Sequence, residues 1–188
     1  MLRSWETVAG EISSVLHDRR VRSEITLDLA PAPARLATHA AAILADITNG
    51  DVEVGNGRLV ILYEPKEQEA WNGHIRCVAY VRADLESEMV TDPLLLEVGW
   101  SWVEDSLRNR AIEPISLSAT ISRSGSQSFG EISERTPEGS IELRASWTVA
   151  EGSGVDVSVL AWCDLLAQAA GLEPLPDGVT SINTPLRK

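Results

Sequence analysis

Hydrophobic residues recur along this chain in two periods, which predict helices near both ends and strands between them. The first sixteen residues carry apolar side chains at helical spacing and predict an amphipathic helix. A proline-rich start at 31–34, followed by an apolar stripe that ends at Ile47, predicts a second helix. Between these two predicted helices, apolar and polar residues alternate briefly over 25–29, which permits a short edge strand.

From residue 59 onward the period changes to two, which is typical of strands. Residues 59–64 form an apolar run of strand length, and a polar loop joins them to an alternating strand at 74–82, so a hairpin is expected. Residues 115–122 and 141–148 alternate in the same way and predict two half-buried antiparallel strands.

Two further helices follow the two strand pairs. A helix capped by Asp92 and started by Pro93 separates the pairs and runs to about Arg110. A mostly apolar helix from Val155 ends before Gly171, a residue suited to a helix C-terminus.

This order predicts an α+β fold. We expect a mainly antiparallel sheet of four to six strands in a ββαββα order behind two N-terminal helices, with the helices packed on one face. Residues 1–188 are expected to form a single domain, with 174–188 a loose tail rich in Pro, Gly and Thr. The order is similar to that of bacterial secretion-chaperone-like domains, an analogy of fold that carries no function.

The composition of the chain bears on its partners and its compartment rather than on its fold. The net charge of −12 argues against binding to nucleic acid or anionic membranes, which would repel the chain. No apolar run approaches the ~18 residues of a membrane span, and no signal segment is visible. Cys77 and Cys163 are predicted to be buried free thiols, and the cytoplasm is the expected compartment.

The helix after Pro93 is unusually apolar, over an arc of roughly 200° where about 100° is typical of a surface helix. We therefore expect it between two layers or at an interface. Trp100 and Trp102 lie about 200° apart around it and fill the core or form a binding surface. Because residues 36–47 could cover this helix within one chain, a monomer is expected over a homodimer.

One sheet face gathers candidate binding residues. If the strands at 74–82 and 141–148 are neighbours, three arginines of an acidic chain share a face, where they suit carboxylate or phosphate. The alternative is a solvated face on which Arg144 pairs with Glu142 or lies under an N-terminal helix. The residues of this face are His74, Arg76, Tyr80, Arg82, Arg144, Ser146 and Thr148.

No catalytic signature is visible: the chain has no phosphate loop, no paired-cysteine metal spacing, no HExxH and no GxSxG. We expect a binding or scaffold module for a protein or a small anionic ligand, with no catalytic residue, cofactor or metal ligand assigned. The alternative is a small metal-dependent enzyme that uses Glu97, Glu104 and Asp105 of the central helix.

Four segments resemble a known family. They are AWNGHIRCVAYVRA at 70–83, TDPLLLEVGWSW at 91–102, the turn at 128–130 and IELRASW at 141–147. They are similar to the actinobacterial family catalogued as domain of unknown function 3000, and the resemblance covers nearly the whole chain. It implies a cytoplasmic actinobacterial protein and supplies no activity, ligand or catalytic residue.

Overall fold

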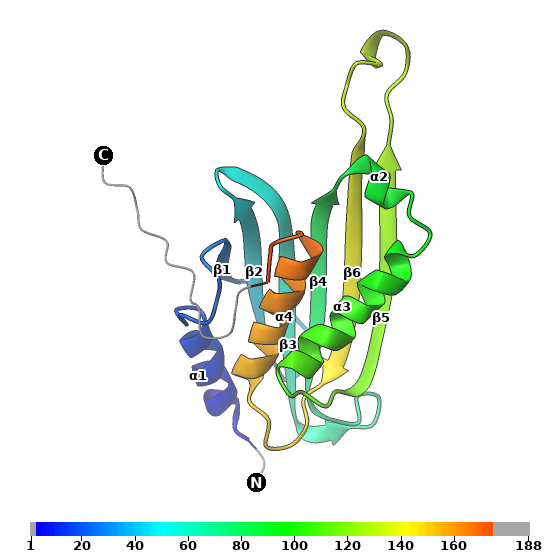
Figure 1. Cartoon of the computed structure of the whole chain (residues 1–188). Coiled ribbons are helices and arrows are strands. Elements are labelled where there is room, and N and C mark those ends of the chain that lie inside the picture. The colour runs from blue at the N-terminus through cyan, green and yellow to red at the C-terminus, as the bar shows by residue number, and fades with distance from the viewer. Residues whose placement is uncertain (1–2, 175–188) are drawn as a thin grey trace, which may run out of the picture.

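Six strands form one antiparallel sheet in the order β1-β2-β3-β4-β6-β5 (Figure 1). The computed structural model describes residues 3–174. The strands are β1 (Ile25–Ala30), β2 (His39–Asn49), β3 (Val52–Gln68), β4 (Gly73–Leu85), β5 (Ile115–Ser126) and β6 (Glu138–Thr148). The helices are α1 (Trp5–Val15), α2 (Ser87–Val90), α3 (Leu95–Asn109) and α4 (Val155–Ala169), with a 3-10 turn η1 (Gly130–Ile132) between β5 and β6.

The predicted α+β fold with an antiparallel sheet of four to six strands is confirmed. The ββαββα order behind two N-terminal helices is wrong in its first half, since one helix and four strands precede α2. The segment predicted as the second helix forms β2, which pairs with both β1 and β3. Its buried residues Ile43, Ala45 and Ile47 follow the period of a strand, and these contacts across the sheet outweigh a local helical preference.

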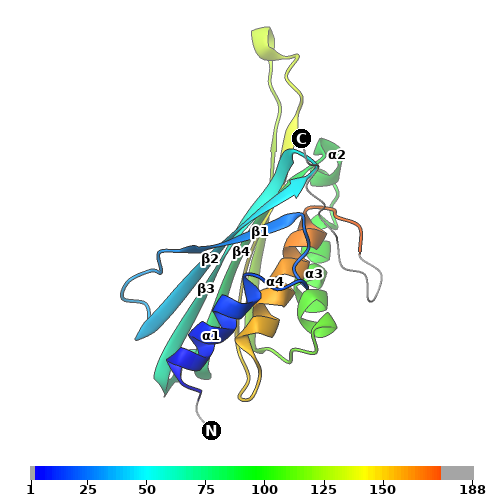
Figure 2. The same ribbon diagram turned by 90° about the vertical axis from the view of Figure 1, so that its left-hand side faces the viewer.

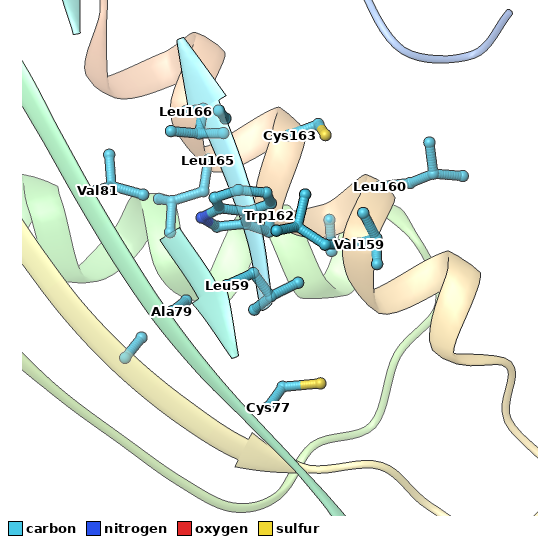
Figure 3. Close-up of a cluster of buried hydrophobic side chains, with 14 of the residues drawn as sticks. Leu59, Cys77, Ala79, Val81, Val159, Leu160, Trp162, Cys163, Leu165 and Leu166 are labelled. Atoms are coloured by element: carbon cyan, nitrogen blue, oxygen red, sulfur yellow. The ribbon is translucent and has the colours of Figure 1, made fainter. Parts of the chain in front are cut away.

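Helix α4 packs on the middle of the sheet, on the same side as α3 (Figure 2). Figure 3 shows Trp162 of α4 among Leu59 of β3 and Ala79 and Val81 of β4, and all four side chains are buried. The indole Nε1–H of Trp162 also donates to the carbonyl oxygen of Tyr80, at 3.3 Å. Both packing and a hydrogen bond therefore hold α4 against the central strands.

Gly57 allows this close approach. A Cβ atom at Gly57 would lie 2.7 Å from Leu166 Cδ2, 2.8 Å from the Tyr80 carbonyl oxygen and 2.9 Å from Trp162 Cζ2. The sequence Gly-Asn-Gly at 55–57 is typical of a turn, yet these residues lie inside β3. Glycine is needed there because α4 occupies the space of a side chain.

Helix α3 covers the other end of the sheet. Gly99 sits against Ile121 of β5 and Ile141 of β6, and both Trp100 and Trp102 are half-buried against the core. Because residues 39–47 lie in β2, the segment 36–47 does not cover α3 as expected. Instead α4 runs beside it, and Arg110 after α3 binds Asp164 of α4 through two hydrogen bonds of 2.6 and 2.8 Å.

The remaining expectations concern thiols, membranes and the tail. Cys77 and Cys163 are free and buried, as predicted. Within residues 3–174, no helix is long and apolar enough to cross a membrane. The predicted loose tail at 174–188 lies, apart from its first residue, outside the described residues.

Candidate functional site: the open face of the sheet

The face of the sheet opposite α3 and α4 is not covered by any helix of residues 3–174, and we call it the open face (Figure 2). Strict alternation along β4 creates it: Ile75, Cys77, Ala79, Val81 and Ala83 are buried under the helices, and the residues between them point the other way. The open face is formed in its centre by Arg58 and Val60 of β3, by Arg76, Val78, Tyr80, Arg82 and Asp84 of β4, and by Glu142, Arg144 and Ser146 of β6.

Three of these side chains form a row across the sheet. Arg58 of β3, Tyr80 of β4 and Arg144 of β6 are direct cross-strand partners, so their Cβ atoms are separated by about 5 Å from strand to strand. The Arg144 guanidinium lies 5.5 Å from the centroid of the Tyr80 ring. The Tyr80 ring thus contacts one guanidinium, that of Arg144, and Arg58 occupies the paired position on the strand at its other side.

Each member of the row has a local partner. Arg144 Nη2 lies 2.7 Å from Glu142 Oε2, while its side chain remains 59% exposed. Arg58 Nη2 donates to the Pro31 carbonyl oxygen at 3.2 Å. Burial, and then the neighbouring Glu142 carboxylate, raise the pKa of the Tyr80 hydroxyl, so the ring is neutral at physiological pH. The ion pair of Arg144 with Glu142 is the one named above as an alternative reading of this face.

Arg76 has different surroundings. Its guanidinium donates to the Ser116 carbonyl oxygen at 2.9 Å, to Thr148 Oγ1 at 3.1 Å and to Ser146 Oγ at 2.7 Å. No carboxylate of the described residues lies within 4.0 Å of it. Burial lowers the pKa of Arg76, because a half-buried cation without an anion loses hydration.

The two ends of β4 complete the face. Arg82 pairs with Asp84 at 3.0 Å, and both line a polar hollow of about 490 Å³ between β4, β5 and β6. At the other end, His74 Nδ1 lies 3.1 Å from the Glu64 carbonyl oxygen. Across residues 56–62, 76–84 and 142–148, at the centre of the open face, the charged side chains are four arginines and two carboxylates, a local charge of 4 − 2 = +2 in a chain of −12. The outer strands β1 and β2 add Asp28 and Asp46 to the same face, so the surplus is confined to its centre.

The structure brings some predicted binding residues together and separates others. Strands β4 and β6 are neighbours, so His74, Arg76, Tyr80, Arg82 and Arg144 share the open face. The two tryptophans, Trp100 and Trp102, lie on α3, on the opposite side of the sheet.

Arg58 is not among the predicted binding residues because the predicted strand begins at residue 59, whereas β3 begins at Val52, seven residues earlier. The alternation of buried Gly55, Gly57, Leu59 and Ile61 with Asn56 and Arg58 was the signal that could have found it.

The carboxylates of α3 do not form a cluster with further ligands. Glu97 is exposed, and Asp105 binds Arg108 at 2.5 Å. Among residues 3–174, no group of three or more His, Cys, Asp or Glu side chains is placed to hold a metal ion. This part of the chain therefore offers no observation that supports the alternative of a metal-dependent enzyme.

Comparison with known proteins gives one match. The model of a protein family described as "Protein of unknown function (DUF3000)" matches residues 8–180. No curated protein and no solved structure matches the chain significantly. The match agrees with the resemblance of the four sequence segments, while the similarity to secretion-chaperone-like domains gains no support from a solved structure.

Proposed function

The chain belongs to the DUF3000 family, and because the description of that family names no activity, we propose from the geometry that the chain is a binding module whose open face takes an anionic partner. The observation that carries this proposal is the row Arg58–Tyr80–Arg144 on the open face. Guanidinium groups bind carboxylate and phosphate through planar, paired hydrogen bonds, and the aromatic ring in the same row adds a surface for stacking.

The charge distribution supports the same conclusion. A chain of net charge −12 repels anions at a distance, so a local surplus of cations marks where an anion is least disfavoured. Such a surface also discriminates, because the acidic remainder of the molecule discourages polyanions that cover more than this face. For that reason we keep nucleic acid as the least favoured partner.

The shared chemistry of the partner is a carboxylate or phosphate group, supplied by an acidic protein segment or by a small ligand. Two probes separate these sources: a fluorescently labelled hexaglutamate peptide and inorganic phosphate, each titrated at about 150 mM salt, where exposed charges further apart than about 8 Å are screened. Binding of the peptide without phosphate indicates a protein segment, whereas saturable binding of phosphate indicates a small ligand.

Arg144→Gln tests the site, and Arg108→Gln is its matched control. Both variants remove one positive charge from an exposed arginine that is paired with a carboxylate, but Arg108 lies on α3. We expect Arg144→Gln to weaken binding of hexaglutamate about tenfold, equivalent to about 1.4 kcal/mol, and Arg108→Gln to change it little. Equal effects of both variants, or no binding of either probe, would contradict the proposal.

The proposal also covers the compartment, the oligomeric state and the alternative function. We place the protein in the cytoplasm, where free thiols such as Cys77 and Cys163 persist, and we expect a monomer. The rival, a metal-dependent enzyme, predicts that Mg²⁺ or Mn²⁺ raises the melting temperature and that Glu104→Gln abolishes the effect.

A further inference from the structure

Arg76 stands apart from the other arginines of the open face. Arg82 and Arg144 each pair with a carboxylate two residues away on the same strand. Arg58 has no such pair, but its side chain is exposed to water. Arg76 alone combines partial burial with the absence of a carboxylate partner among the described residues. A half-buried guanidinium in this state is costly, and a bound anion reduces the cost.

The surroundings of Arg76 hold its guanidinium in one orientation. An arginine has five N–H donors, and three hydrogen bonds to Ser116, Ser146 and Thr148 are present, so 5 − 3 = 2 donors remain. The Nε–H group makes none of these bonds. Because the guanidinium is already fixed by its three partners, little conformational entropy is lost when an anion takes the remaining donors.

Neighbouring side chains add two further elements of a site. Ser118 Oγ of β5 lies 3.2 Å from Ser146 Oγ, which places a second hydroxyl within the same network. Val78 follows Arg76 on the open face and is 41% exposed, an apolar surface directly beside the cation. A charged group with hydroxyl donors and an adjacent apolar surface suits a small organic anion better than a bare ion.

We propose that Arg76 binds a single carboxylate or phosphate group of a small organic anion, with the hydroxyl of Ser118 as an additional donor and Val78 as the contact for the apolar part. This inference rests on the proposed function, since it assigns a ligand class to one position of the open face. The site lies where β4, β6 and β5 meet, two residues along β4 from Val78 and four from Tyr80. Four residues correspond to about 13 Å of strand at about 3.3 Å per residue, so the Arg76 site is a position on the open face distinct from the row.

The test uses the arginine Nε–H resonances of the full ¹⁵N-labelled chain. Acetate, butyrate and inorganic phosphate are titrated, and the Arg76 resonance is assigned by its loss in Arg76→Lys. We expect a saturable shift of the Arg76 Nε–H with butyrate binding more tightly than acetate, because butyrate adds two CH₂ groups that can lie on Val78. Phosphate distinguishes a phosphate ligand from a carboxylate ligand, and saturation by either supports the site.

Two variants test the assignment without relying on Arg76 alone. Arg76→Lys keeps the charge and loses the planar fork, and we expect at least a tenfold loss of affinity, followed by the backbone amide shifts of Val78 and Ser118 because this variant has no Arg76 resonance. Ser118→Ala leaves all three Arg76 hydrogen bonds in place and should weaken binding about threefold while the backbone spectrum remains that of the folded chain. Arg123→Lys, on the helix-covered side of β5, is the control and should bind as the parent chain does.

The outcomes separate this inference from the proposed function. If the Nε–H groups of Arg58 or Arg144 shift and that of Arg76 does not, the Arg76 site is wrong and the open face remains a binding surface. The same conclusion holds if hexaglutamate binds with the expected Arg144 dependence while no small anion shifts Arg76. If neither hexaglutamate nor any small anion binds, both proposals fail.

Discussion

Replacement of Gly57 by alanine tests the packing that supports the open face. The added Cβ would lie under 3.0 Å from two side chains of α4 and from the carbonyl oxygen of Tyr80. That oxygen belongs to the neighbouring central strand and accepts a hydrogen bond from Trp162, so it cannot simply withdraw. The helix must therefore shift away from the sheet.

The magnitude follows from two opposing effects. Overpacking of a well-packed core costs about 1–3 kcal/mol, whereas removal of a strand glycine returns about 0.5–1 kcal/mol of backbone entropy. We expect a net loss of about 1–2 kcal/mol in the free energy of unfolding, which lowers the melting temperature by about 2–8 °C for a chain of this size. Urea unfolding followed by tryptophan fluorescence measures the loss, and Trp162 itself reports on the site.

Gly10→Ala is the matched control. Gly10 lies in the middle of α1, and a Cβ there would meet nothing within 4 Å. The same chemical change should therefore stabilise the chain by about 0.5–1 kcal/mol, the ordinary gain of alanine over glycine in a helix. If Gly57→Ala is as stable as the parent chain, or more stable, α4 does not approach β3 as described and the reasoning is refuted.

Three further predictions concern the core and one surface ion pair. Trp162→Phe should cost about 1–3 kcal/mol in urea unfolding, because a buried carbonyl loses a donor and a void opens; an unchanged stability would show that the indole contact is not formed. Cys77 and Cys163 should resist maleimide labelling at pH 8 until the chain unfolds, since burial raises the pKa of each thiol to about 12; rapid labelling of either in the native chain would contradict this burial. Hydrogen bonding from Arg22 lowers the pKa of Glu24 from 4.5 to about 2, so its stabilisation is present above pH 4.5 and is lost as the pH falls toward 2; the stability difference between the parent chain and Glu24→Gln should shrink over that window, and a constant difference would exclude the linkage.

Strands β4, β5 and β6 were predictable because each has one face under helices and one face in water. Alternation such as Ile75, Cys77, Ala79 is a property of neighbouring residues in one strand, so the sequence displays it directly. Helices α3 and α4 were predictable for a similar reason, since their apolar residues recur at helical spacing. The candidate residues on β4 and β6 could be assigned to one face by parity alone.

Strand β2 was not predictable from its local pattern. Several alanines and the prolines before it favour a helix, and Ile43 and Ile47 satisfy helical spacing as well as strand spacing. Pairing with β1 and β3 along its length decides the structure, and such long-range contacts leave no distinct mark in the sequence.

The particular state of Arg76 was equally hidden. Its position on the open face follows from parity, but its three hydrogen bonds depend on how β4, β6 and β5 align. If that alignment had placed a carboxylate opposite Arg76, the two residues would have formed an ordinary ion pair. The residue types were visible in the sequence, whereas the pairing between them was not.

The measurement that tests the central claim most directly is a map of amide chemical-shift changes in the ¹⁵N-labelled chain during a titration with hexaglutamate. If the open face is the binding surface, the shifts concentrate at the central residues of β3, β4 and β6, around Arg58, Tyr80 and Arg144, and they disappear in Arg144→Gln. Shifts confined to α1, α3 or α4, or no saturable shift at all, would contradict the account.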